Sequence, residues 1–282
     1  MKIGIIGASG FIGENLYEFL KINKNYNVFS FPSYFKSKEK WTNKVIQQIK
    51  IKKPHIIINC SQTQNLSTTN KNLVDILNSN LYSNIMYVNE AIKNKEFKGY
   101  ISFGTKWELG DIKQKKPLNF YAATKKANDI FYEFYSNQQS ALISLKIFDT
   151  YGPRDKRKKF LNDLLNSYKK NKILKITAGK QYLDYVHIND VCSLILKIIN
   201  DINKKKLRGF KTFTVSSKKP LRLIDLIKTL NKILNRSLKV KINKKYRKFE
   251  SLNPTKLINN YPGWKMKFKL KEELKNIFDK DR

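Results

Sequence analysis

Short apolar runs alternate with longer amphipathic segments through the first half of the 282-residue chain. The runs are predicted to be strands, at 3–6, 27–31, 55–59, 99–103 and 142–148. The segments between them carry apolar residues at helical spacing, which predicts helices at 11–22, 41–50, 71–95 and 119–135. The run at 55–59 has three consecutive isoleucines, which is typical of a strand buried on both faces. This alternation predicts an α/β protein built on a doubly wound parallel sheet.

The first predicted strand leads directly into a glycine pattern on which the first helix opens. Glycine permits a sharp turn and the close approach of a diphosphate, and the free N–H groups at a helix start favour negative charge. In the first strand–helix unit, the pattern indicates a Rossmann-type dinucleotide site. The residues expected to hold the cofactor here are Gly7, Ser9, Gly10, Phe11, Ile12 and Gly13.

The end of the second predicted strand bears on the choice of cofactor. In dinucleotide folds a carboxylate at this point binds the adenosine ribose, whereas a basic or hydroxyl residue admits a 2′-phosphate. Ser33 follows the strand, and no carboxylate occurs before Glu39. This favours NADP(H). NAD(H) stays open, because a pocket that uses backbone groups needs no carboxylate.

The pattern changes beyond Tyr151-Gly152-Pro153, where a basic loop at 154–159 precedes shorter elements. Short strands are predicted near 173–177 and 213–216, and helices are predicted up to 168 and at 191–199, 221–234 and 271–279. No repeat or low-complexity linker marks a boundary, so any second lobe is expected to be interleaved with the first. We expect residues 1–150 with about 181–208 to form the dinucleotide-binding domain, and 151–180 with 209–282 to form a small substrate-binding lobe.

The formal net charge of +35 would ordinarily suggest a nucleic-acid partner. Only seven of the 57 basic residues are arginine, however, and the lysines are spread through every segment with abundant Asn and Ile. Arginine is the residue most used to recognise bases and phosphates bidentately. We therefore attribute the lysines to an AT-rich coding sequence and expect no nucleic-acid partner.

Two cysteines, Cys60 and Cys192, and two histidines provide neither a disulfide framework nor a ligand set at metal-site spacing, so no metal is expected. No apolar run is long enough to cross a bilayer. Glycines at 4, 7, 10 and 13 interrupt any apolar core of a signal peptide. These features predict a cytoplasmic protein without membrane insertion.

Tyr121 and Lys125 lie four residues apart on a predicted helix and therefore share one face. A neighbouring ammonium stabilises a phenolate and is expected to draw the Tyr121 pKa from about 10 toward neutrality. Such a pair can give a proton to a carbonyl oxygen or take one from an alcohol. Four other pairs have this spacing: Tyr17/Lys21, Tyr34/Lys38, Tyr168/Lys172 and Tyr261/Lys265. Only Tyr121/Lys125 follows a strand that ends in a hydroxyl, Thr105, at the edge where parallel sheets bind ligands.

The glycine pattern, Thr105, Tyr121 and Lys125 occur in the order of an extended short-chain dehydrogenase/reductase, and the chain resembles the nucleotide-sugar epimerase/dehydratase type of that family. The spacing of three between successive glycines is also similar to that family's cradle. Further segments carry the resemblance along most of the chain: Asn59-Cys60-Ser61, Asn80, Phe148-Asp149-Thr150-Tyr151-Gly152-Pro153, the run from Gln181 to Val191, and Gly263-Trp264.

The resemblance implies a role for each matching residue. Tyr121 would be the general acid–base, Lys125 would bind the nicotinamide ribose and lower the Tyr121 pKa, and Thr105 would bind the reacting sugar oxygen. The alternative for Thr105 is a hydroxyl that only caps backbone. The additional cofactor residues implied are Ser33, Cys60, Ser61 and Phe148, beside Tyr121 and Lys125. The implied substrate residues are Asn80, Thr105, Lys106, Trp107, Tyr121, Asp149, Arg154, Tyr182 and Asp184.

Departures from the family pattern narrow the expected reaction. Similar sugar dehydratases carry Asp-Glu directly after the threonine, where this chain has Lys106-Trp107, so dehydration is not expected. Cys60 and Cys192 do not stand where the combined epimerase–reductases place their catalytic cysteine. Glu108 is either a second acid or a solvated residue, and we favour a solvated one.

The resemblance is strongest to 4-ketoreductases of the type that makes CDP-abequose, CDP-paratose or dTDP-fucose for surface polysaccharide. It implies NAD(P)H-dependent reduction of a nucleotide-linked 4-keto-6-deoxyhexose by a homodimer. A nucleotide-sugar 4-epimerase with tightly held NAD is the alternative enzyme. A cofactor-binding protein without catalysis is the third possibility.

Overall fold

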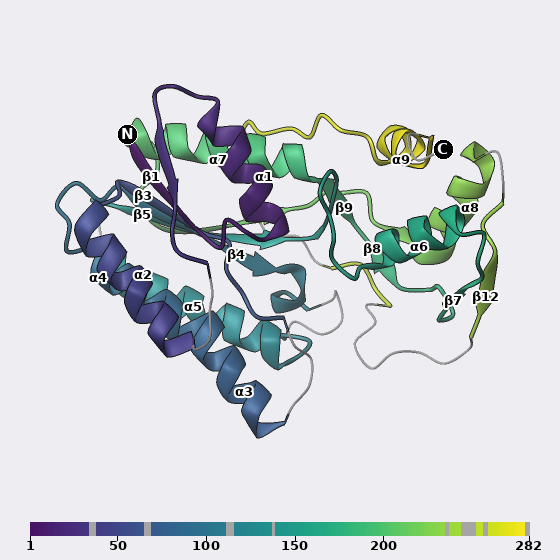
Figure 1. The fold of residues 1–282 in the computed structure, drawn as a ribbon, viewed down its shortest axis with the longest axis horizontal. Helices are drawn as coiled ribbons and strands as arrows, with labels where there is room; N and C mark the ends of the chain where they lie inside the picture. Colours follow the sequence, from purple (N-terminus) through teal and green to yellow (C-terminus); the bar gives the residue numbers. More distant parts are fainter. Residues whose placement is uncertain are drawn as a thin grey trace.

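The computed structural model describes residues 1–33, 38–64, 69–110, 116–136, 139–234, 237–243, 252–255 and 259–279. Its centre is a six-stranded sheet in which every neighbouring pair is parallel (Figure 1). In sheet order the strands are β10 (Gly209–Val215), β5 (Ala141–Ile147), β4 (Gly99–Thr105), β3 (Ile56–Asn59), β1 (Lys2–Ile6) and β2 (Asn27–Ser30). The order reverses beside β1, which confirms the predicted doubly wound sheet.

Helices cover both faces of this sheet (Figure 1). On one face lie α1 (Phe11–Lys21) and α7 (Ile188–Asn203), which pack against each other. On the other face lie α2 (Lys38–Lys52), α4 (Ser83–Ala91) and α5 (Phe120–Tyr135). The long helix predicted at 71–95 is instead a run of three elements: α3 (Asn70–Leu77), the π-helical turn η1 (Asn78–Tyr82) and α4. In the part of the chain that the structure describes, no helix is long and apolar enough to cross a membrane.

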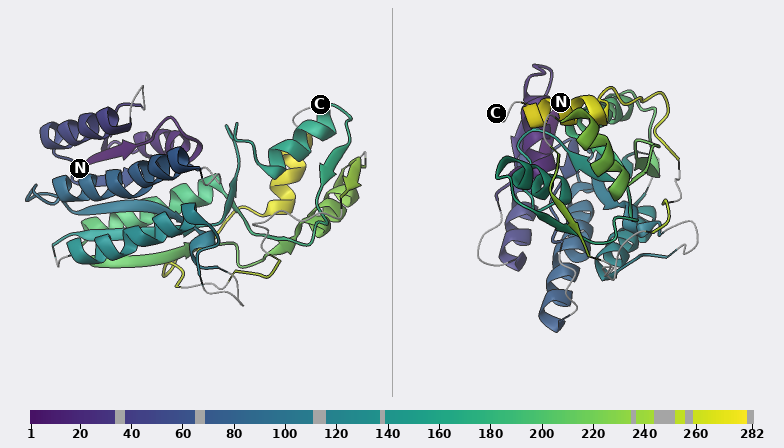
Figure 2. Two further views of the ribbon diagram at one scale, coloured as in Figure 1. Left: turned by 90° about the horizontal axis from the view of Figure 1, so that it is seen from below. Right: turned by 90° about the vertical axis from the view of Figure 1, so that its right-hand side faces the viewer.

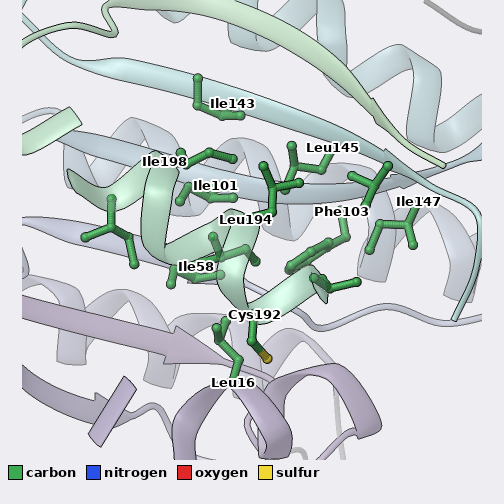
Figure 3. Close-up of a cluster of buried hydrophobic side chains, with 14 of the residues drawn as sticks. Leu16, Ile58, Ile101, Phe103, Ile143, Leu145, Ile147, Cys192, Leu194 and Ile198 are labelled. Carbon is green, nitrogen blue, oxygen red and sulfur yellow. The ribbon is translucent and has the colours of Figure 1, made fainter. Parts of the chain in front are cut away.

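Alternating residues of the central strands build two separate cores. Ile58, Ile101 and Ile143 face α1 and α7 (Figure 3), whereas Ile57 and Tyr100 face α2, α4 and α5. The strands therefore need no polar face, as their near-continuous apolar runs predicted. Burying each isoleucine fully contributes about 1.5–3 kcal/mol to folding.

A second, smaller part of the molecule lies beyond the carboxyl ends of the strands (Figure 2). Its helices are α6 (Phe160–Lys169), α8 (Leu223–Ile233) and α9 (Leu270–Asp279), which share a third apolar core. Three two-stranded sheets join it: β7 (Leu174–Ile176) with β12 (Val240–Ile242), β8 (Tyr182–Leu183) with β11 (Leu221–Arg222), and β6 (Asp149–Tyr151) with β9 (Tyr185–His187).

The domain limits expected from the sequence need two corrections. The strand at 209–215 was assigned to the substrate lobe, but β10 pairs along its whole length with β5 and forms the edge of the large sheet. The residues from 181 to 187 were assigned to the dinucleotide-binding domain, but β8 pairs with β11, and Tyr185 packs in the core of the smaller part. The chain crosses between the two parts more often than the apolar pattern indicated.

The packing of the sheet gives a test of its core. Replacing Ile101 with Ala removes a fully buried side chain between β4 and α7, so the free energy of unfolding should fall by about 2–5 kcal/mol. Urea unfolding followed by circular dichroism measures it. The matched control is Ile51→Ala in α2, where the side chain is 73% exposed, and the change should stay near about 0.5 kcal/mol. Equal losses for the two variants would contradict the assigned core.

Candidate active site

The glycine pattern folds into a tight turn between β1 and α1. Gly7 has a φ of 76°, in the left-handed region that favours glycine, and a Cβ there would lie 2.6 Å from the Ser61 nitrogen. A Cβ on Gly13 would overlap the Gly7 carbonyl oxygen. Gly10 caps α1 without a side chain, so no side-chain oxygen occupies the first N–H groups of the helix. The backbone geometry thus fits the predicted diphosphate cradle.

A cavity of about 280 Å³ lies over this turn. It brings together Gly7, Ser9, Gly10, Ser33, Cys60 and Ser61, all of which the sequence analysis assigned to the cofactor. Trp41, Gln62, Thr63, Ser79 and Ser83 complete its lining. Phe11 and Gly13 do not line it. The Arg157 guanidinium lies 4.0 Å from the centre of the Phe11 ring. Ile12 lines the neighbouring cavity instead.

That neighbouring cavity, of about 400 Å³, opens at the carboxyl ends of β4 and β5, where ligands of parallel sheets bind. The residues predicted to act on the substrate or cofactor that line it are Thr105, Lys106, Trp107, Tyr121, Phe148, Asp149 and Tyr182. Gln62 lines both cavities. The cradle and the Thr105/Tyr121 group therefore lie in adjacent cavities that share a wall residue.

Tyr121 is held at the start of α5 with its hydroxyl toward the cavity. Asn119 caps the helix by accepting a hydrogen bond from the Ala122 nitrogen at 2.8 Å. The Trp107 ring meets the Tyr121 ring edge-on, and the Tyr121 hydroxyl donates to Gln62 Oε1 at 2.7 Å. The ring is 3% exposed. Lys125 follows one helical turn later and is 6% exposed.

The electrostatics of this pair differ from the prediction. Burial raises the pKa of Tyr121 well above its usual value, and the charge of Glu108 adds to the rise. The expected lowering of this pKa by Lys125 is therefore wrong for the protein alone. Burial instead acts on the ammonium: it lowers the Lys125 pKa to about 8. Both groups are desolvated, and desolvation outweighs their mutual influence.

Glu108 is not solvated, contrary to the sequence analysis. It is 1% exposed and lies on the 3₁₀ turn η2 (Lys106–Glu108). Its carboxylate accepts from the Thr105 backbone nitrogen at 2.6 Å and forms an ion pair with Lys146. Thr105 Oγ1 in turn accepts from the Trp107 nitrogen at 3.4 Å, which completes a capping box. The Thr105 hydroxyl therefore caps the backbone, which was the alternative to substrate binding, and Thr105 also lines the cavity.

Lys106 and Asp149 form a second ion pair, inside the cavity. Lys106 Nζ lies 2.5 Å from Asp149 Oδ2, and the lysine is buried. Asp149 also accepts from the Asp184 backbone nitrogen at 3.3 Å. Each side chain neutralises the other, so the cavity wall beside Thr105 carries a paired charge of each sign.

Three predicted substrate residues are not brought to the cavity. Asn80 is fully buried, and its amide bonds both the nitrogen and the oxygen of Thr63 at 2.9 Å, so it fixes the loop that carries Gln62. Asp184 bonds Ser216 Oγ at 2.6 Å and the Ser217 nitrogen at 2.7 Å.

Arg154, the third of these, has a φ of 66° and reaches no closer than 4.0 Å to Glu14 on α1. Arg157 occupies the cavity in its place. Asp155 holds that guanidinium at 2.7 Å, and the Thr150 carbonyl accepts from it at 2.8 Å.

Sequence reasoning missed other residues of the site: Gln62, Gln64, Arg157, Lys159, Glu108 and Lys146. Gln62 and Gln64 follow β3 at the edge where ligands bind, so their position in the loop was a signal. Arg157 lies in the basic loop noted above and is one of only seven arginines. Lys146 gave no signal, because an apolar strand hides a single lysine until its partners are known.

No three histidine, cysteine or acidic side chains come together as a metal site among the described residues. Cys60 lines the cofactor cavity, and burial raises its thiol pKa well above the usual value. Cys192 is on α7 and packs in the core between this helix and its neighbours (Figure 3).

Known proteins show what this arrangement resembles. The CDP-abequose synthase of Yersinia pseudotuberculosis is 26% identical over 213 residues, which is 72% of this chain and 75% of that protein. The structure of UDP-glucuronic acid 4-epimerase from Bacillus cereus, in complex with UDP-glucuronic acid and NAD, has a TM-score of 0.80 at 19% identity and covers 100% of this chain and 99% of that one. RMD from Pseudomonas aeruginosa, complexed with NADPH, has a TM-score of 0.78 at 15% identity and covers 99% and 98%.

The model of one family matches most of the chain. Its description is NAD dependent epimerase/dehydratase family, and the match runs over residues 3–210. That span includes the cradle, Thr105, Tyr121 and Lys125, so it confirms the resemblance that those residues carry. The chain belongs to the NAD dependent epimerase/dehydratase family, and it is an enzyme of that family.

Proposed function

We propose that this enzyme reduces the 4-keto group of a nucleotide-linked 4-keto-6-deoxyhexose, with NAD(P)H, in the cytoplasmic assembly of surface polysaccharide. The observation that carries the proposal is the composition of the cavity wall beside Thr105. Tyr121 faces the cavity as a proton donor, but Lys106 is a paired cation and Glu108 is turned away into an ion pair with Lys146. The site therefore has a proton donor for a carbonyl oxygen that accepts hydride at its carbon, but it lacks the second free acid and base that the elimination of water needs.

The residues divide the reduction among them. A reduced nicotinamide supplies a hydride to the carbonyl carbon when the cofactor is bound. Tyr121 gives its proton to the carbonyl oxygen, and its high pKa in the protein alone keeps it protonated beforehand. Thr105 orients the same oxygen through its hydroxyl. Lys125, on α5 one turn after Tyr121, would bind the nicotinamide ribose.

Binding of the cofactor is proposed to use the cradle and the cavity above it. Gly7 and Gly10 let the diphosphate approach the backbone, and Cys60 and Ser61 form the opposite wall. Among the described residues lining this cavity there is no carboxylate, and Ser33 lies at the end of β2. This agrees with the expected preference for NADP(H). Residues 34–37, which follow Ser33, lie outside the described residues.

The nucleotide diphosphate of the substrate is proposed to bind at the basic end of the cavity. Arg157 is fixed there by Asp155, and Lys159 contacts Gln64 at 3.3 Å. Burial lowers the Lys159 pKa, with the Arg157 charge acting in the same direction. An incoming diphosphate would offset both effects, since it brings negative charge to two partly desolvated cations. These residues replace Arg154 in our assignment.

A second copy of the chain is proposed to cover an apolar face made by α3 and α5, which pack together. Val74 and Leu77 on α3 and Ile130, Phe131 and Phe134 on α5 are exposed, and Phe134 reaches 79%. Several exposed apolar side chains on two packed helices are what an interaction surface requires. The relation between identical copies would place each pair of helices against its equivalent.

The reaction has a direct test. The purified protein, mixed with a CDP- or dTDP-linked 4-keto-6-deoxyglucose, should oxidise NADPH, followed by the loss of absorbance of the reduced nicotinamide. The paired control is NADH at the same concentration, which should be oxidised more slowly. No oxidation with any 4-keto nucleotide sugar would exclude the reductase. NAD that remains bound through purification, with a UDP-sugar interconverted and no net cofactor consumed, would establish the 4-epimerase.

Tyr121→Phe tests the proton donor. Loss of the hydroxyl should lower kcat by about 10²–10⁴-fold, because general acid catalysis is removed. Cofactor affinity, measured by nicotinamide fluorescence, should change little. The matched control is Tyr17→Phe, since Tyr17 has the same four-residue spacing to a lysine but lies on α1 away from both cavities. Normal turnover in Tyr121→Phe would point to a protein that binds cofactor without this chemistry.

The assembly has its own test. Phe134→Glu places a charge in the centre of the α3/α5 face, so a dimer should convert to monomers in analytical ultracentrifugation. Ile51→Glu, at an exposed position of α2 that is not part of this face, should leave the mass unchanged. A wild-type monomer at micromolar concentration would refute the proposed interface.

A further inference from the structure

Glu108 connects the turn that carries Thr105 to the neighbouring strand. Its carboxylate accepts from the Thr105 nitrogen at 2.6 Å with one oxygen and pairs with Lys146 of β5 through the other. A Cβ on Gly104 would overlap this carboxylate, so glycine at 104 makes room for it. The sequence places a glycine, a hydroxyl and an acid within five residues so that the acid can fold back under the turn.

Lys146 extends the connection to the helix that carries Tyr121 and Lys125. Its ammonium is 2% exposed and also pairs with Asp129 Oδ2 at 2.7 Å. Asp129 lies on α5, one turn beyond Lys125. A buried ammonium is costly unless paired and hydrogen-bonded, so Lys146 holds η2, β5 and α5 in one arrangement.

Building on the reduction proposed above, we propose that Glu108 is the positioning residue of this site: it fixes the Thr105 backbone and, through its ion pair with Lys146, sets the charge of a buried cluster that reaches the Lys125 side of α5 at Asp129. Asp129 pairs with the same Lys146 but does not contact Thr105. The two carboxylates therefore have separable roles, although they share a partner.

The charges around Lys125 agree with this assignment. Burial lowers the Lys125 pKa to about 8, Glu108 opposes the lowering, Lys146 adds to it, and Cys60 opposes it weakly. These groups come from η2, β5 and the end of β3, and Tyr121 and Asp129 lie on the same helix as Lys125. Burial raises the Glu108 pKa and the Asp129 charge adds to the rise, whereas the Lys146 ammonium and the Thr105 N–H both favour the ionised form.

Glu108→Gln removes the charge with little change in shape, and the Lys125 titration reports the result without substrate or cofactor. Protein labelled with ¹³C at lysine Cε is titrated by NMR from about pH 6 to about pH 11. A lysine with a lowered pKa loses its charge within this range. The Lys125 resonance is identified by its loss in Lys125→Met. In the wild type it should titrate near 8. In Glu108→Gln it should titrate about one unit lower.

Asp129→Asn is the matched control, because it removes one carboxylate from the same lysine. The Lys125 titration should stay at its wild-type value in this variant. An unchanged titration in Glu108→Gln, or an equal shift in Asp129→Asn, would overturn the proposal. Should Glu108→Gln not fold, the double variant Glu108→Gln/Lys146→Met also removes the buried ammonium with which Glu108 forms its ion pair. Because Glu108 acts on Lys125 more strongly than Lys146 does, the titration in the double variant should still move downward. An upward or absent shift there would be equally decisive against it.

Turnover gives a second readout that a merely structural role would not move. Glu108 raises the pKa of both Tyr121 and Lys125, and both act in their protonated forms during reduction. Loss of its charge should therefore shift the basic limb of the kcat–pH profile to lower pH in Glu108→Gln and leave it in place in Asp129→Asn. If Glu108→Gln and Asp129→Asn had the same kcat–pH profile, the role of Glu108 in turnover would be refuted. If the wild type reduces no 4-keto sugar, the reductase fails while the Lys125 titration still decides the role of Glu108.

Discussion

The buried ammonium of Lys146 is the constraint on which the active-site edge of the sheet depends. A cation at 2% exposure loses most of its hydration, and in a protein interior that costs several kcal/mol unless anions and hydrogen bonds replace the water. Glu108, Asp129 and Ser144 Oγ, at 3.0 Å, provide the replacement. Satisfying this one group brings the end of β4, the strand β5 and the helix α5 into register.

The smaller part of the molecule is joined to the same edge by a polar connection of a similar kind. The Asp149 nitrogen donates to the Asp184 carbonyl at 2.9 Å, and the Asp184 carboxylate bonds the chain at Ser216 just after β10. Asp149 and Asp184, which the sequence assigned to the substrate, therefore connect the smaller part of the molecule to the edge of the sheet. Asp149 still faces the cavity with its paired Lys106, whereas Asp184 does not. These hydrogen bonds link the two parts of the molecule, and the cavity is lined by residues of both.

How much of the structure the sequence predicts depends on how far apart in the chain the interacting residues lie. Most strands, most helices and the cradle follow from periodicity and from glycines a few residues apart, and the structure reproduces them with changes at their ends. The helix expected at 71–95 is an exception, because a π-helical turn divides it. Tyr121 could be chosen among five similar pairs because the edge of a parallel sheet collects the strand ends. The burial of Glu108 could not be predicted from the sequence, since its partner Lys146 lies 38 residues away on a strand whose other residues are mostly apolar. The placement of β10 failed for the same reason, because a strand's neighbour is a property of the whole sheet. Asn80 and Arg154 matched family positions, but the local backbone, a π-helical turn and a left-handed residue, aims their side chains elsewhere.

The two ion pairs beside Thr105 also explain why a lysine can follow the threonine at all. An unpaired ammonium at 106 would repel the Lys159 and Arg157 cations in the same cavity and would be costly to desolvate. Asp149 removes that cost, and the Lys106 cation in return keeps the Asp149 carboxylate from repelling an anionic substrate. The pair is neutral overall, and so is the pair of Arg157 with Asp155, so the net positive charge of the cavity lining comes from Lys159. In the reduction that we propose, a nucleotide diphosphate would bind at the basic end of the cavity and the sugar ring would lie beside Thr105 and Tyr121, where the paired Lys106 and Asp149 would provide neither the free acid nor the free base that an elimination requires.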